Sequence, residues 1–471
     1  MRVLIISGSR EIVHVMVPPL GEASVAAYLL QQGHDVQLLD LTLSHDFKKD
    51  LQNTLSRFDP QVIGFSIRNI DSTTYPGNLF FYLPVRNVIQ YVKEIADPNI
   101  PFVLGGAGFS IFAEEILRDL NLSLGIVGDG EFAFAALLKQ LEQHENPAQL
   151  SQGICCIDKS GTYHQRPPWH VMNLDALPIP ARELLDNAEY PLNPLTPQGA
   201  LWGNLQTKRG CPKNCIYCSY KYIEGAHVRY RSPANIAAEL EYLVNSLGIK
   251  RVFIVDSVLN LDYTHLQKTC QEIIKSHIDV QWGANYVPSR EFIDLLPLMK
   301  QSGAAHLATG MESLSNDILN QMQKDRSAEE SILTAQKCME LEIEQLIHML
   351  LGGPGETLDS VHFTFDRLET IESYHGEAWQ GAGDALLFVG LRIYPHTPLQ
   401  TLAEAEGIIP KGLNLLTPKF FLDPGLDEYA LYELVREYCS VNPRWMCPGL
   451  GLNNPAGFAE LSQLQFSKYQ H

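Results

Sequence analysis

Three cysteines, Cys211, Cys215 and Cys218, are spaced C-x3-C-x2-C in a short loop that also holds glycine and proline. Thiolates this close together can bind one metal centre, and soft sulfur ligands suit iron–sulfur clusters or zinc. A structural zinc ion or an ordinary electron-transfer cluster takes four protein ligands. Three cysteines therefore favour a [4Fe–4S] cluster with one iron open to a substrate or cofactor. A zinc loop with a distant fourth ligand, or three structural cysteines, is the alternative.

The composition limits the classes of protein to consider. A length of 471 residues predicts two or three domains, and a hydrophobic content of 45% is ample for their cores. The formal net charge of −19 argues against nucleic acid or anionic membranes as partners. The apolar runs are too short for a signal peptide or a membrane span. Nine cysteines, an odd number, do not indicate a disulfide framework, so we expect a cytoplasmic protein.

The elements before the cysteine loop indicate a first domain over residues 1–145. Short apolar runs that end in glycine alternate with helical segments, as in a doubly wound α/β domain with its ligand site at the carboxyl ends of the strands. A flavodoxin-like or response-regulator module is the alternative for this domain, although the acidic cluster of a phosphoacceptor is missing. The expected strands are residues 3–7, 36–40, 61–66, 102–106 and 125–131.

A connector over residues 146–196 is expected to hold a hairpin and then a stiff, proline-containing linker. After it, strands alternate with helices six times, which predicts a partial (β/α)6 barrel over residues 197–415 with functional residues at the strand ends. Residues 416–471 form a C-terminal cap region, with Tyr429, Leu431, Leu434 and Tyr438 on the apolar face of a helix. The barrel strands are expected just before Cys211 and at residues 251–255, 280–284, 306–310, 346–351 and 386–391.

The cysteine loop, with an aromatic residue before its third cysteine, resembles the signature of radical S-adenosylmethionine (radical SAM) enzymes. Three strand ends also match that family: the G-x-E-S segment at 310–313, the glycine-rich segment at 351–357, and R-x-Y-P-x-T-P-L at 392–399. Residues 1–145 resemble the cobalamin-binding domain that precedes many radical SAM barrels. The fold class expected is therefore α/β: a Rossmann-like B12-binding domain, a partial (β/α)6 radical SAM barrel and a small C-terminal region.

The resemblance assigns the open iron of a cluster held by Cys211, Cys215 and Cys218 to SAM. Each strand-end residue also has a purely structural interpretation. Glu312 could be a charge at a helix start, the glycines could form a tight turn without a ligand, and Arg392 could belong to an ion pair. The residues that the resemblance implies for SAM are Tyr217, Asp256, Glu312, Ser313, Gly352, Gly353, Gly355 and Arg392.

For cobalamin, the sequence lacks the D-x-H-x-x-G pattern whose histidine ligates cobalt in other B12 proteins. The base tail of a bound cobalamin should then be displaced with no histidine on cobalt. Arg68 could lie under the cobalt without coordinating it, because a guanidinium has no free lone pair, or it could pair with Asp71. The residues that the resemblance implies for cobalamin are Pro19, Leu20, Arg68, Gly105, Gly106, Gly128, Gly130 and Glu131.

The function that the resemblance implies is a cobalamin-dependent radical SAM methyltransferase. It would cleave SAM with a [4Fe–4S] cluster and use methylcobalamin to methylate an organic substrate, a small molecule or a peptide. A reductant such as flavodoxin or ferredoxin would supply electrons. A B12-binding cyclase, ring-contraction or oxidative enzyme without methyl transfer is a second hypothesis. A non-catalytic, metal-stabilised binding protein is the third.

Overall fold

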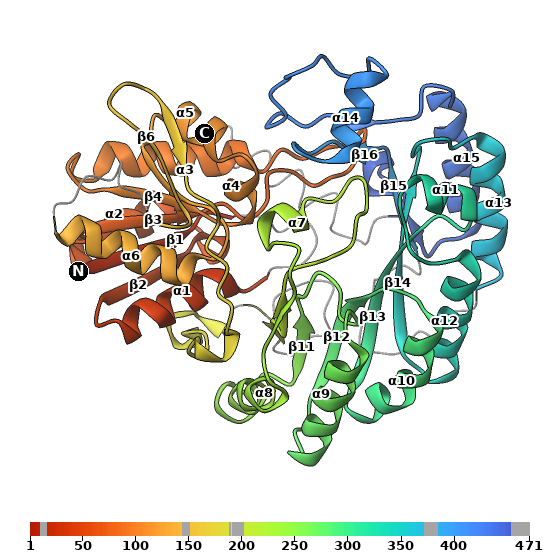
Figure 1. Ribbon diagram of the computed structural model, residues 1–471, viewed down its shortest axis with the longest axis horizontal. Coiled ribbons are helices and arrows are strands. Elements are labelled where there is room, and N and C mark those ends of the chain that lie inside the picture. Colours follow the sequence, from red (N-terminus) through yellow and green to blue (C-terminus); the bar gives the residue numbers. More distant parts are fainter. Residues whose placement is uncertain (10–16, 144–150, 188–189, 191–201, 372–384, 454–471) are drawn as a thin grey trace. The chain divides into compact units, whose positions relative to one another are not determined.

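The computed structural model describes residues 1–9, 17–143, 151–187, 190, 202–371 and 385–453. The chain divides into two compact units (Figure 1). The first unit consists of Met1–Ser72, Phe80–Tyr190 and Tyr220–Tyr230, and the second of Thr73–Leu79, Pro191–Ser219 and Arg231–His471. The described part of the predicted connector, from residue 151 to Tyr190, therefore belongs to the first unit.

The first unit has a seven-stranded sheet in the order β2-β1-β3-β4-β5-β6-β7. The strands from β2 to β5 are parallel, and β6 and β7 add the predicted hairpin to the sheet in antiparallel pairing. The strand order reverses between β1 and β3, and ligands of such sheets bind beside the strand ends at that reversal. The strands are β1 (Arg2–Ser7), β2 (Asp35–Asp40), β3 (Val62–Ser66), β4 (Phe102–Gly105), β5 (Leu124–Ile126), β6 (Ile154–Ile157) and β7 (Tyr163–Gln165).

Helices cover both faces of this sheet, so the predicted doubly wound α/β fold is confirmed (Figure 1). Helices α1 and α6 bury their apolar side chains against strand residues in one core, and α3 and α5 bury theirs on the opposite face. The helices are α1 (Leu20–Gln31), α2 (Phe47–Phe58), α3 (Tyr82–Ile95), α4 (Ala107–Ile111), α5 (Ala113–Leu120), α6 (Gly130–Glu142) and the short α7 (Tyr220–Ile223).

The second unit has a parallel seven-stranded sheet in the order β18-β15-β14-β13-β12-β11-β8. The six strands from β8 to β15 correspond to the six that the sequence predicts for a partial barrel. The seventh, β18, comes from the C-terminal region, which the sequence did not predict to join the sheet. The strands are β8 (Trp202–Leu205), β11 (Arg251–Ile254), β12 (Gln281–Tyr286), β13 (Ala304–Glu312), β14 (Glu344–Leu351), β15 (Ala385–Val389) and β18 (Trp445–Met446).

Of the eight helices of this unit in the described residues, all except α14 share a core with the alternate strand residues that point to one face of the sheet. Helix α8 begins after Ser232, whose side chain accepts from the Asn235 backbone, and its C-terminal cap is Gly248 with φ of 69°. The helices are α8 (Pro233–Leu247), α9 (Tyr263–Lys275), α10 (Arg290–Gln301), α11 (Asn316–Gln321), α12 (Ala328–Glu340), α13 (Leu358–Glu369), α14 (Pro398–Ala405) and α15 (Glu428–Val441).

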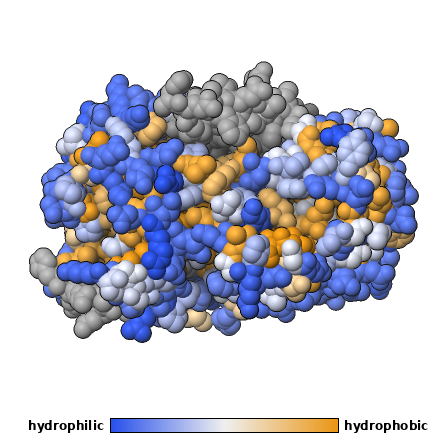
Figure 2. Space-filling model, turned by 90° about the horizontal axis from the view of Figure 1, so that it is seen from above, coloured by the Kyte–Doolittle hydropathy of each residue, from blue (hydrophilic) through white to orange (hydrophobic). Residues whose placement is uncertain are grey.

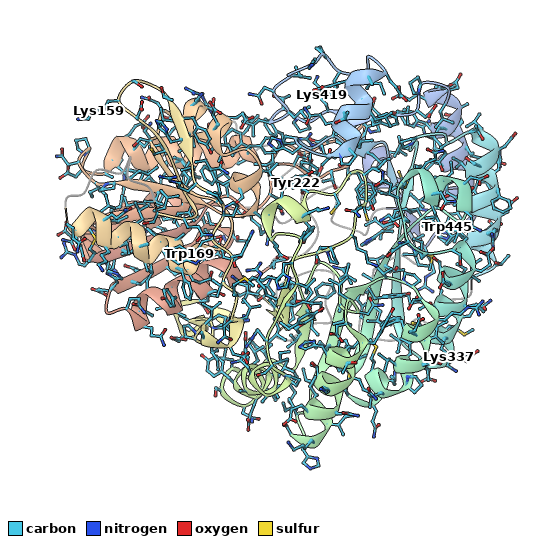
Figure 3. All side chains as sticks on the ribbon, viewed as in Figure 1. Lys159, Trp169, Tyr222, Lys337, Lys419 and Trp445 are labelled. Carbon is cyan, nitrogen blue, oxygen red and sulfur yellow. The ribbon has the colours of Figure 1, made fainter. Side chains whose placement is uncertain are left out.

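The C-terminal region packs against the outer side of the barrel unit. Trp445, labelled in Figure 3, is 5% exposed, and its ring lies 5.4 Å from Phe365 and stacks on Tyr438. Leu431 and Leu434 of α15 are buried, as the sequence predicts. Tyr429 is 71% exposed, so its predicted place on the apolar face was wrong: the buried stripe continues instead through residues later in the helix.

The surface is largely hydrophilic in the view of Figure 2, with smaller apolar patches between the polar side chains. In the part of the chain that the structure describes, we find no helix with the length and apolar character to cross a membrane.

Candidate active site

The cysteine loop follows β9 (Lys208–Arg209) and begins at Gly210, whose φ of 97° favours glycine. Two backbone hydrogen bonds hold the loop in the barrel unit: Ile216 N donates to Met322 O at 3.3 Å, and Leu399 N donates to Ile216 O at 3.0 Å. Cys211 is buried, whereas Cys215 and Cys218 are partly exposed. The loop thus presents thiols from an anchored backbone.

The donor set suits a cluster with one iron per cysteine. Among the residues described, no three or more His, Cys, Asp or Glu side chains gather closely enough to hold a single metal ion. One zinc ion would draw its thiolates to about 4 Å from one another, because each Zn–S bond is about 2.3 Å. A cluster spaces its thiolates more widely, since each of them binds a different iron. Three soft thiols on one short, anchored loop are the donors that a cluster with three protein ligands requires.

Glu312, at the end of β13, is bound to the cysteine loop through Tyr217. The Tyr217 hydroxyl donates to Glu312 Oε1 at 2.8 Å, and Lys324 Nζ donates to the same hydroxyl at 2.7 Å. Lys324 Nζ lies 3.0 Å from Glu312 Oε1, and Arg326 pairs with Oε2. Burial acts to raise the pKa of Glu312, but Lys324 and Arg326 outweigh it, so the pKa is lowered. The carboxylate is a buried anion that joins three segments.

The backbone at the end of β13 is shaped around this carboxylate. Glu312 has a φ of 56°, which is unusual for a residue with a side chain, and the pairing of β13 with β14 is irregular between Gly310 and Glu312. The carboxylate folds back over Gly310, where a Cβ atom would collide with Glu312 Oε1. Arg326 also donates to the Gly310 and Met311 carbonyls. This explains physically why a glycine stands two residues before the glutamate.

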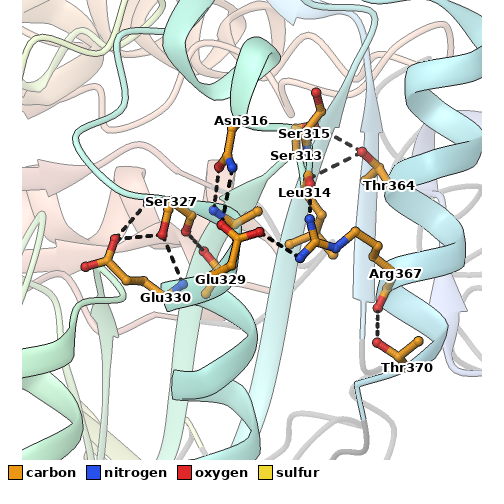
Figure 4. A network of polar contacts seen from close by, with 12 residues as sticks. Ser313, Leu314, Ser315, Asn316, Ser327, Glu329, Glu330, Thr364, Arg367 and Thr370 are labelled. Atoms are coloured by element: carbon orange, nitrogen blue, oxygen red, sulfur yellow. Dashed lines mark hydrogen bonds and ion pairs between the residues drawn. The ribbon is translucent and has the colours of Figure 1, made fainter.

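Ser313 is buried and takes part in a hydrogen-bond network with α13 (Figure 4). Its hydroxyl lies 3.1 Å from the Thr364 hydroxyl and accepts from Ser315 N at 3.1 Å. Arg367, one turn further along α13, donates to Leu314 O at 3.2 Å. These contacts fix the turn that follows Glu312. The predicted contact of Ser313 with SAM stays a prediction.

Asp256 follows β11 and is 1% exposed. Its carboxylate accepts from Lys208 Nζ at 2.8 Å and from the backbone N of Thr207 at 2.7 Å, and it also pairs with the Thr207 hydroxyl. Asp256 therefore holds the segment between β8 and the cysteine loop. Its predicted role as a SAM contact remains a prediction.

The glycine-rich segment after β14 forms a turn that closes on Glu356. Gly352 and Gly355 have φ of 86° and 75°. Glu356 Oε2 accepts from Gly352 N and from Gly353 N, the latter at 3.1 Å. Glu356 is 1% exposed and its Oε1 has no hydrogen-bond partner, and burial raises its pKa to about 7. The turn is thus built around a buried carboxyl group that the sequence analysis did not single out.

Arg392 is 5% exposed and donates to two backbone carbonyls, Ile393 O at 2.5 Å and Leu415 O at 2.8 Å. Its guanidinium also lies over the ring of Tyr394, 4.8 Å from the centroid. These contacts anchor the chain after β16 (Leu391–Arg392), which pairs with β17 (Phe420–Phe421). The predicted SAM contact of Arg392 stays a prediction, as do those of Tyr217 and the three glycines.

In the first unit, the glycines after β4 have different surroundings. A Cβ atom at Gly106 would stand 2.6 Å from Ile67 O, and the φ of 101° at this position also favours glycine. A Cβ atom at Gly105 would meet only Ile126 O, at 3.9 Å. Gly106 is therefore required by the packing of the protein itself, while a Cβ atom at Gly105 would be at ordinary contact distance from one carbonyl oxygen.

Arg68 lies just after β3, beside the reversal in strand order. It is partly buried, and its Nε has no hydrogen-bond partner of its own. Glu22, at the start of α1, is a buried carboxyl group nearby. Burial raises the pKa of Glu22, whereas a hydrogen bond from Ser66 and the charge of Arg68 act to lower it. Pro19 precedes that helix and Leu20 begins it. The predicted places of Arg68, Pro19 and Leu20 beside cobalamin remain predictions.

The segment after β5 is held by an ion pair that the sequence analysis missed. Asp129 pairs with Arg229 and accepts from Val171 N at 2.8 Å, and all three groups are buried. Gly128, with a φ of 83°, donates to the Ser110 hydroxyl at 3.1 Å. Gly130 begins α6, and Glu131, in its first turn, is 2% exposed. Their contacts with cobalamin also remain predictions.

The ion-pair partners Lys324, Arg326, Lys208 and Arg229 were not predicted. They lie far along the chain from the acidic groups that they bind, and a charged triplet such as Lys324-Asp325-Arg326 usually indicates a solvated loop. The position of Glu356 in the predicted glycine segment was the one available signal for a further functional carboxyl group.

Two family descriptions match the sequence: the B12 binding domain over residues 12–138 and the radical SAM superfamily over residues 205–368. An uncharacterized methyltransferase of Pyrococcus horikoshii is 26% identical over 76% of this chain and 74% of its own length. An anaerobic magnesium-protoporphyrin IX monomethyl ester cyclase of Rubrivivax gelatinosus is 25% identical over 74% of this chain. This chain spans only 61% of the length of that cyclase.

Among solved structures, the radical SAM methyltransferase TsrM of Kitasatospora setae, with cobalamin and a [4Fe–4S] cluster bound, has the same fold. The TM-score is 0.77 with 19% identity, over 95% of this chain and 91% of TsrM. With both family matches in this order along the chain, the protein combines a B12-binding domain with a radical SAM domain, as cobalamin-dependent radical SAM enzymes do.

Proposed function

We propose that this protein is a methyltransferase that transfers a methyl group to a carbon of an organic small molecule. Its cofactors are a [4Fe–4S] cluster, SAM and cobalamin. When bound, the cluster supplies the electron that cleaves SAM, and cobalamin carries the methyl group. The relatives and the solved structures that resemble this chain include methyltransferases, and this supports the proposal.

The residues of the chain divide between three binding tasks. Cys211, Cys215 and Cys218 would hold the cluster. The end of β13 and the glycine turn after β14 would hold SAM, because both lie at strand ends, where barrels of this type bind ligands. The strand ends of the first unit, Gly105 among them, would hold cobalamin.

The observation that carries the proposal is the bonding of Glu312 to the cysteine loop. Tyr217 lies between two of the cysteines, and its hydroxyl donates to the carboxylate at the end of β13. Lys324 and Arg326 hold that carboxylate as an anion, so the strand end and the loop are fixed together before any cofactor binds. The paired carboxylate thereby fixes the end of β13 beside the cysteines, where SAM would bind.

Two further assignments belong to the proposal. A low-potential protein reductant, flavodoxin or ferredoxin, would supply the electron. The protein would work in the cytoplasm, where thiols remain reduced.

The test is anaerobic reconstitution with iron, sulfide and hydroxocobalamin, followed by desalting and metal analysis. We expect about four irons and one cobalt per chain. Incubation with a reductant, a candidate substrate and SAM labelled with deuterium in the methyl group should then give a product heavier by one labelled methyl group. Iron without cobalt, or a product without the label, would contradict the proposal.

A second function is favoured by the likeness to the magnesium-protoporphyrin cyclase. A cyclase of this family would load the same cofactors but would transfer no methyl group. Product mass separates the two hypotheses, since methylation adds the labelled methyl group of SAM to the product and cyclisation does not.

A further inference from the structure

The loop between β3 and α3 belongs to both units of the chain. Residues up to Ser72 and from Phe80 onward are part of the first unit, whereas Thr73–Leu79 are part of the second. We call Thr73–Leu79 the strap. The loop leaves the carboxyl end of β3, at the edge of the sheet where ligands of doubly wound folds bind. The strap is therefore part of a loop at the ligand edge, but another region of the chain holds it.

The side chain of Tyr75 attaches the strap to the C-terminal region. The Tyr75 hydroxyl donates to Glu428 Oε1 at 2.8 Å, and the Tyr432 hydroxyl donates to the same oxygen. The ring of Tyr75 also packs on Phe420, with 5.2 Å between the centroids. Glu428 and Tyr432 belong to α15, and Phe420 belongs to β17. Two elements of the C-terminal region therefore fix this side chain.

The backbone of the strap also fits closely against the residues that follow β18. Gly77 N donates to Gly449 O at 3.0 Å. A Cβ atom at Gly77 would stand 2.7 Å from Gly449 O, and one at Gly449 would stand 2.1 Å from Tyr75 O. Both distances are too short for a real Cβ atom, so each backbone has a glycine where the two meet. This close fit indicates a specific docking site for the strap.

The first part of the same loop is bound at the ligand edge of the first unit. Ile67 N donates to Gly105 O, and Gly108 N donates to Arg68 O, both at 2.8 Å. Residues 69–72 are all that separate Arg68 from the strap. Because the chain between them is so short, a strap that leaves its docking site pulls on the segment at the strand ends.

We propose that the C-terminal region retains cobalamin indirectly: it fixes the strap, and through the strap the loop after β3, so that undocking of the strap speeds the release of cobalamin. Tyr75 and Glu428 are then positioning residues, which act on the cofactor through the loop. A loop that is already fixed loses less conformational entropy when its ligand binds, so docking strengthens binding. This inference rests on the proposed function, since it takes cobalamin as the ligand of the first unit, but it does not depend on methyl transfer.

The rate at which the holoenzyme releases cobalamin tests the proposal. Protein reconstituted with iron, sulfide and radioactively labelled hydroxocobalamin is mixed with an excess of unlabelled hydroxocobalamin, and the label that stays bound is measured after desalting. Tyr75→Phe removes one hydrogen bond of the strap, so we expect about fivefold faster release. Tyr429→Phe, at a position of α15 that is 71% exposed, is the control and should release at the wild-type rate. Equal rates in Tyr75→Phe and wild type would overturn the inference.

Substitutions at Glu428 separate positioning from a general loss of structure. Glu428→Ala removes the acceptor of the Tyr75 hydroxyl and should speed release, whereas Glu428→Gln keeps an acceptor oxygen and should restore most of the wild-type rate. Glu433→Ala, at an exposed position of the same helix, controls for the loss of a carboxylate from α15. Thermal unfolding identifies any variant that is misfolded. Release from Glu428→Gln as fast as from Glu428→Ala would contradict the proposal.

Hydrogen exchange of the wild-type protein tests the same coupling without any substitution. If docking of the strap tightens the binding of cobalamin, bound cobalamin must stabilise docking by the same factor. The Gly77 amide, which donates to Gly449 O, should therefore exchange more slowly in iron-loaded protein with cobalamin than in iron-loaded protein without it. The amides of α10 are the control and should exchange equally in both samples. Unchanged exchange at Gly77, or equal slowing in α10, would overturn the inference.

The same samples separate this inference from the proposed function. Protein that retains iron but no cobalt would overturn both. A product without the labelled methyl group would overturn the methyltransferase and leave the role of the strap standing. A full complement of cobalt, with a release rate that no strap variant changes, would overturn only the present inference.

Discussion

At the scale of single residues, the structure assigns to Glu312 a set of partners that the sequence did not indicate. A glutamate at a strand end was predicted and lies at the end of β13, while its contact with SAM stays a prediction. Lys324 and Arg326 could not be predicted, because only the folded turn after α11 brings them to the carboxylate. Spacing in the sequence predicts which residues are neighbours on one helix or strand. Lys324 and Arg326 lie in the turn between α11 and α12, outside any helix or strand.

Loss of this carboxylate should weaken the fold. Glu312→Gln leaves two buried cations without their anion, so we expect a loss of about 3 kcal/mol in the free energy of unfolding. Glu329→Gln is the control, since Glu329 pairs with Arg367 at the surface, where a pair contributes less than about 1 kcal/mol. Urea unfolding measures both. Equal losses in the two variants would show that Glu312 is not a structural anion.

The same group sets an acid dependence. Because folding lowers the pKa of Glu312 below its ordinary value of 4.5, its contribution is fully present above pH 4.5 and is lost as the pH falls through the pKa of the folded protein. The stability of wild-type protein should therefore fall more steeply below pH 4.5 than that of Glu312→Gln. Parallel curves would contradict the lowered pKa.

The cysteines allow a direct residue-level prediction. Cys218→Ala should reduce the iron bound after reconstitution to a small fraction of the wild-type amount, because two thiolates do not hold the cluster stably. Cys439→Ala, which removes a buried thiol from the core beside α15, should keep the wild-type iron content in whatever protein folds. Iron analysis of desalted protein is the measurement, and full iron in Cys218→Ala would exclude that cysteine as a ligand.

At the scale of elements, the strands and helices were largely predictable and their exact pairings were not. Apolar runs ending in glycine indicated the parallel strands. The strand β18 was missed, because two residues, Trp445 and Met446, are too few to show a period. The predicted glycine turn formed, but its central carboxyl group, Glu356, becomes apparent only when its hydrogen bonds are seen.

The glycine turn after β14 predicts a pH dependence of stability that is opposite in direction to the one that Glu312 predicts. Burial raises the pKa of Glu356 from 4.5 to about 7, so the folded protein binds a proton between these values that the unfolded chain does not. Stability should therefore decline as the pH rises from 4.5 to 7, by on the order of 3 kcal/mol for a shift of this size.

Glu356→Gln should remove this decline, because the amide does not titrate. Glu433→Gln, at an exposed position of α15, should retain it. Urea unfolding at several pH values measures the slope. A slope that persists in Glu356→Gln would show that another group carries the pH dependence.

At the scale of the whole molecule, the two cofactor sites belong to different parts of the chain. The B12-binding match ends at residue 138 and the radical SAM match begins at residue 205. The order of these regions was predictable from the sequence, because each has its own pattern of strand ends. The composition of the two units was not, since sequence alone does not show that residues 73–79 and 220–230 change units.

Because the two cofactor sites are separate, a substitution at one site should remove the cofactor bound there and leave the other cofactor in place. A side chain at Gly105 meets no close protein atom, so Gly105→Val should fold and yet fill the space that we assign to cobalamin. We expect this variant to lose most of its cobalt while it keeps its iron, and Cys218→Ala to show the reverse. Simultaneous loss of both metals from Gly105→Val, with unchanged thermal unfolding, would contradict independent sites.

The interleaving of the two units has a consequence for how the chain is made. The chain passes from one unit to the other five times, and the first unit is complete only with Tyr220–Tyr230, where Arg229 supplies the buried partner of Asp129. Tyr75, which is synthesised early, must wait for its partner Glu428, to which it donates at 2.8 Å. During synthesis, neither unit is therefore complete before part of the other has been made. A fragment that ends at any single point between two of these segments would lack residues of at least one unit.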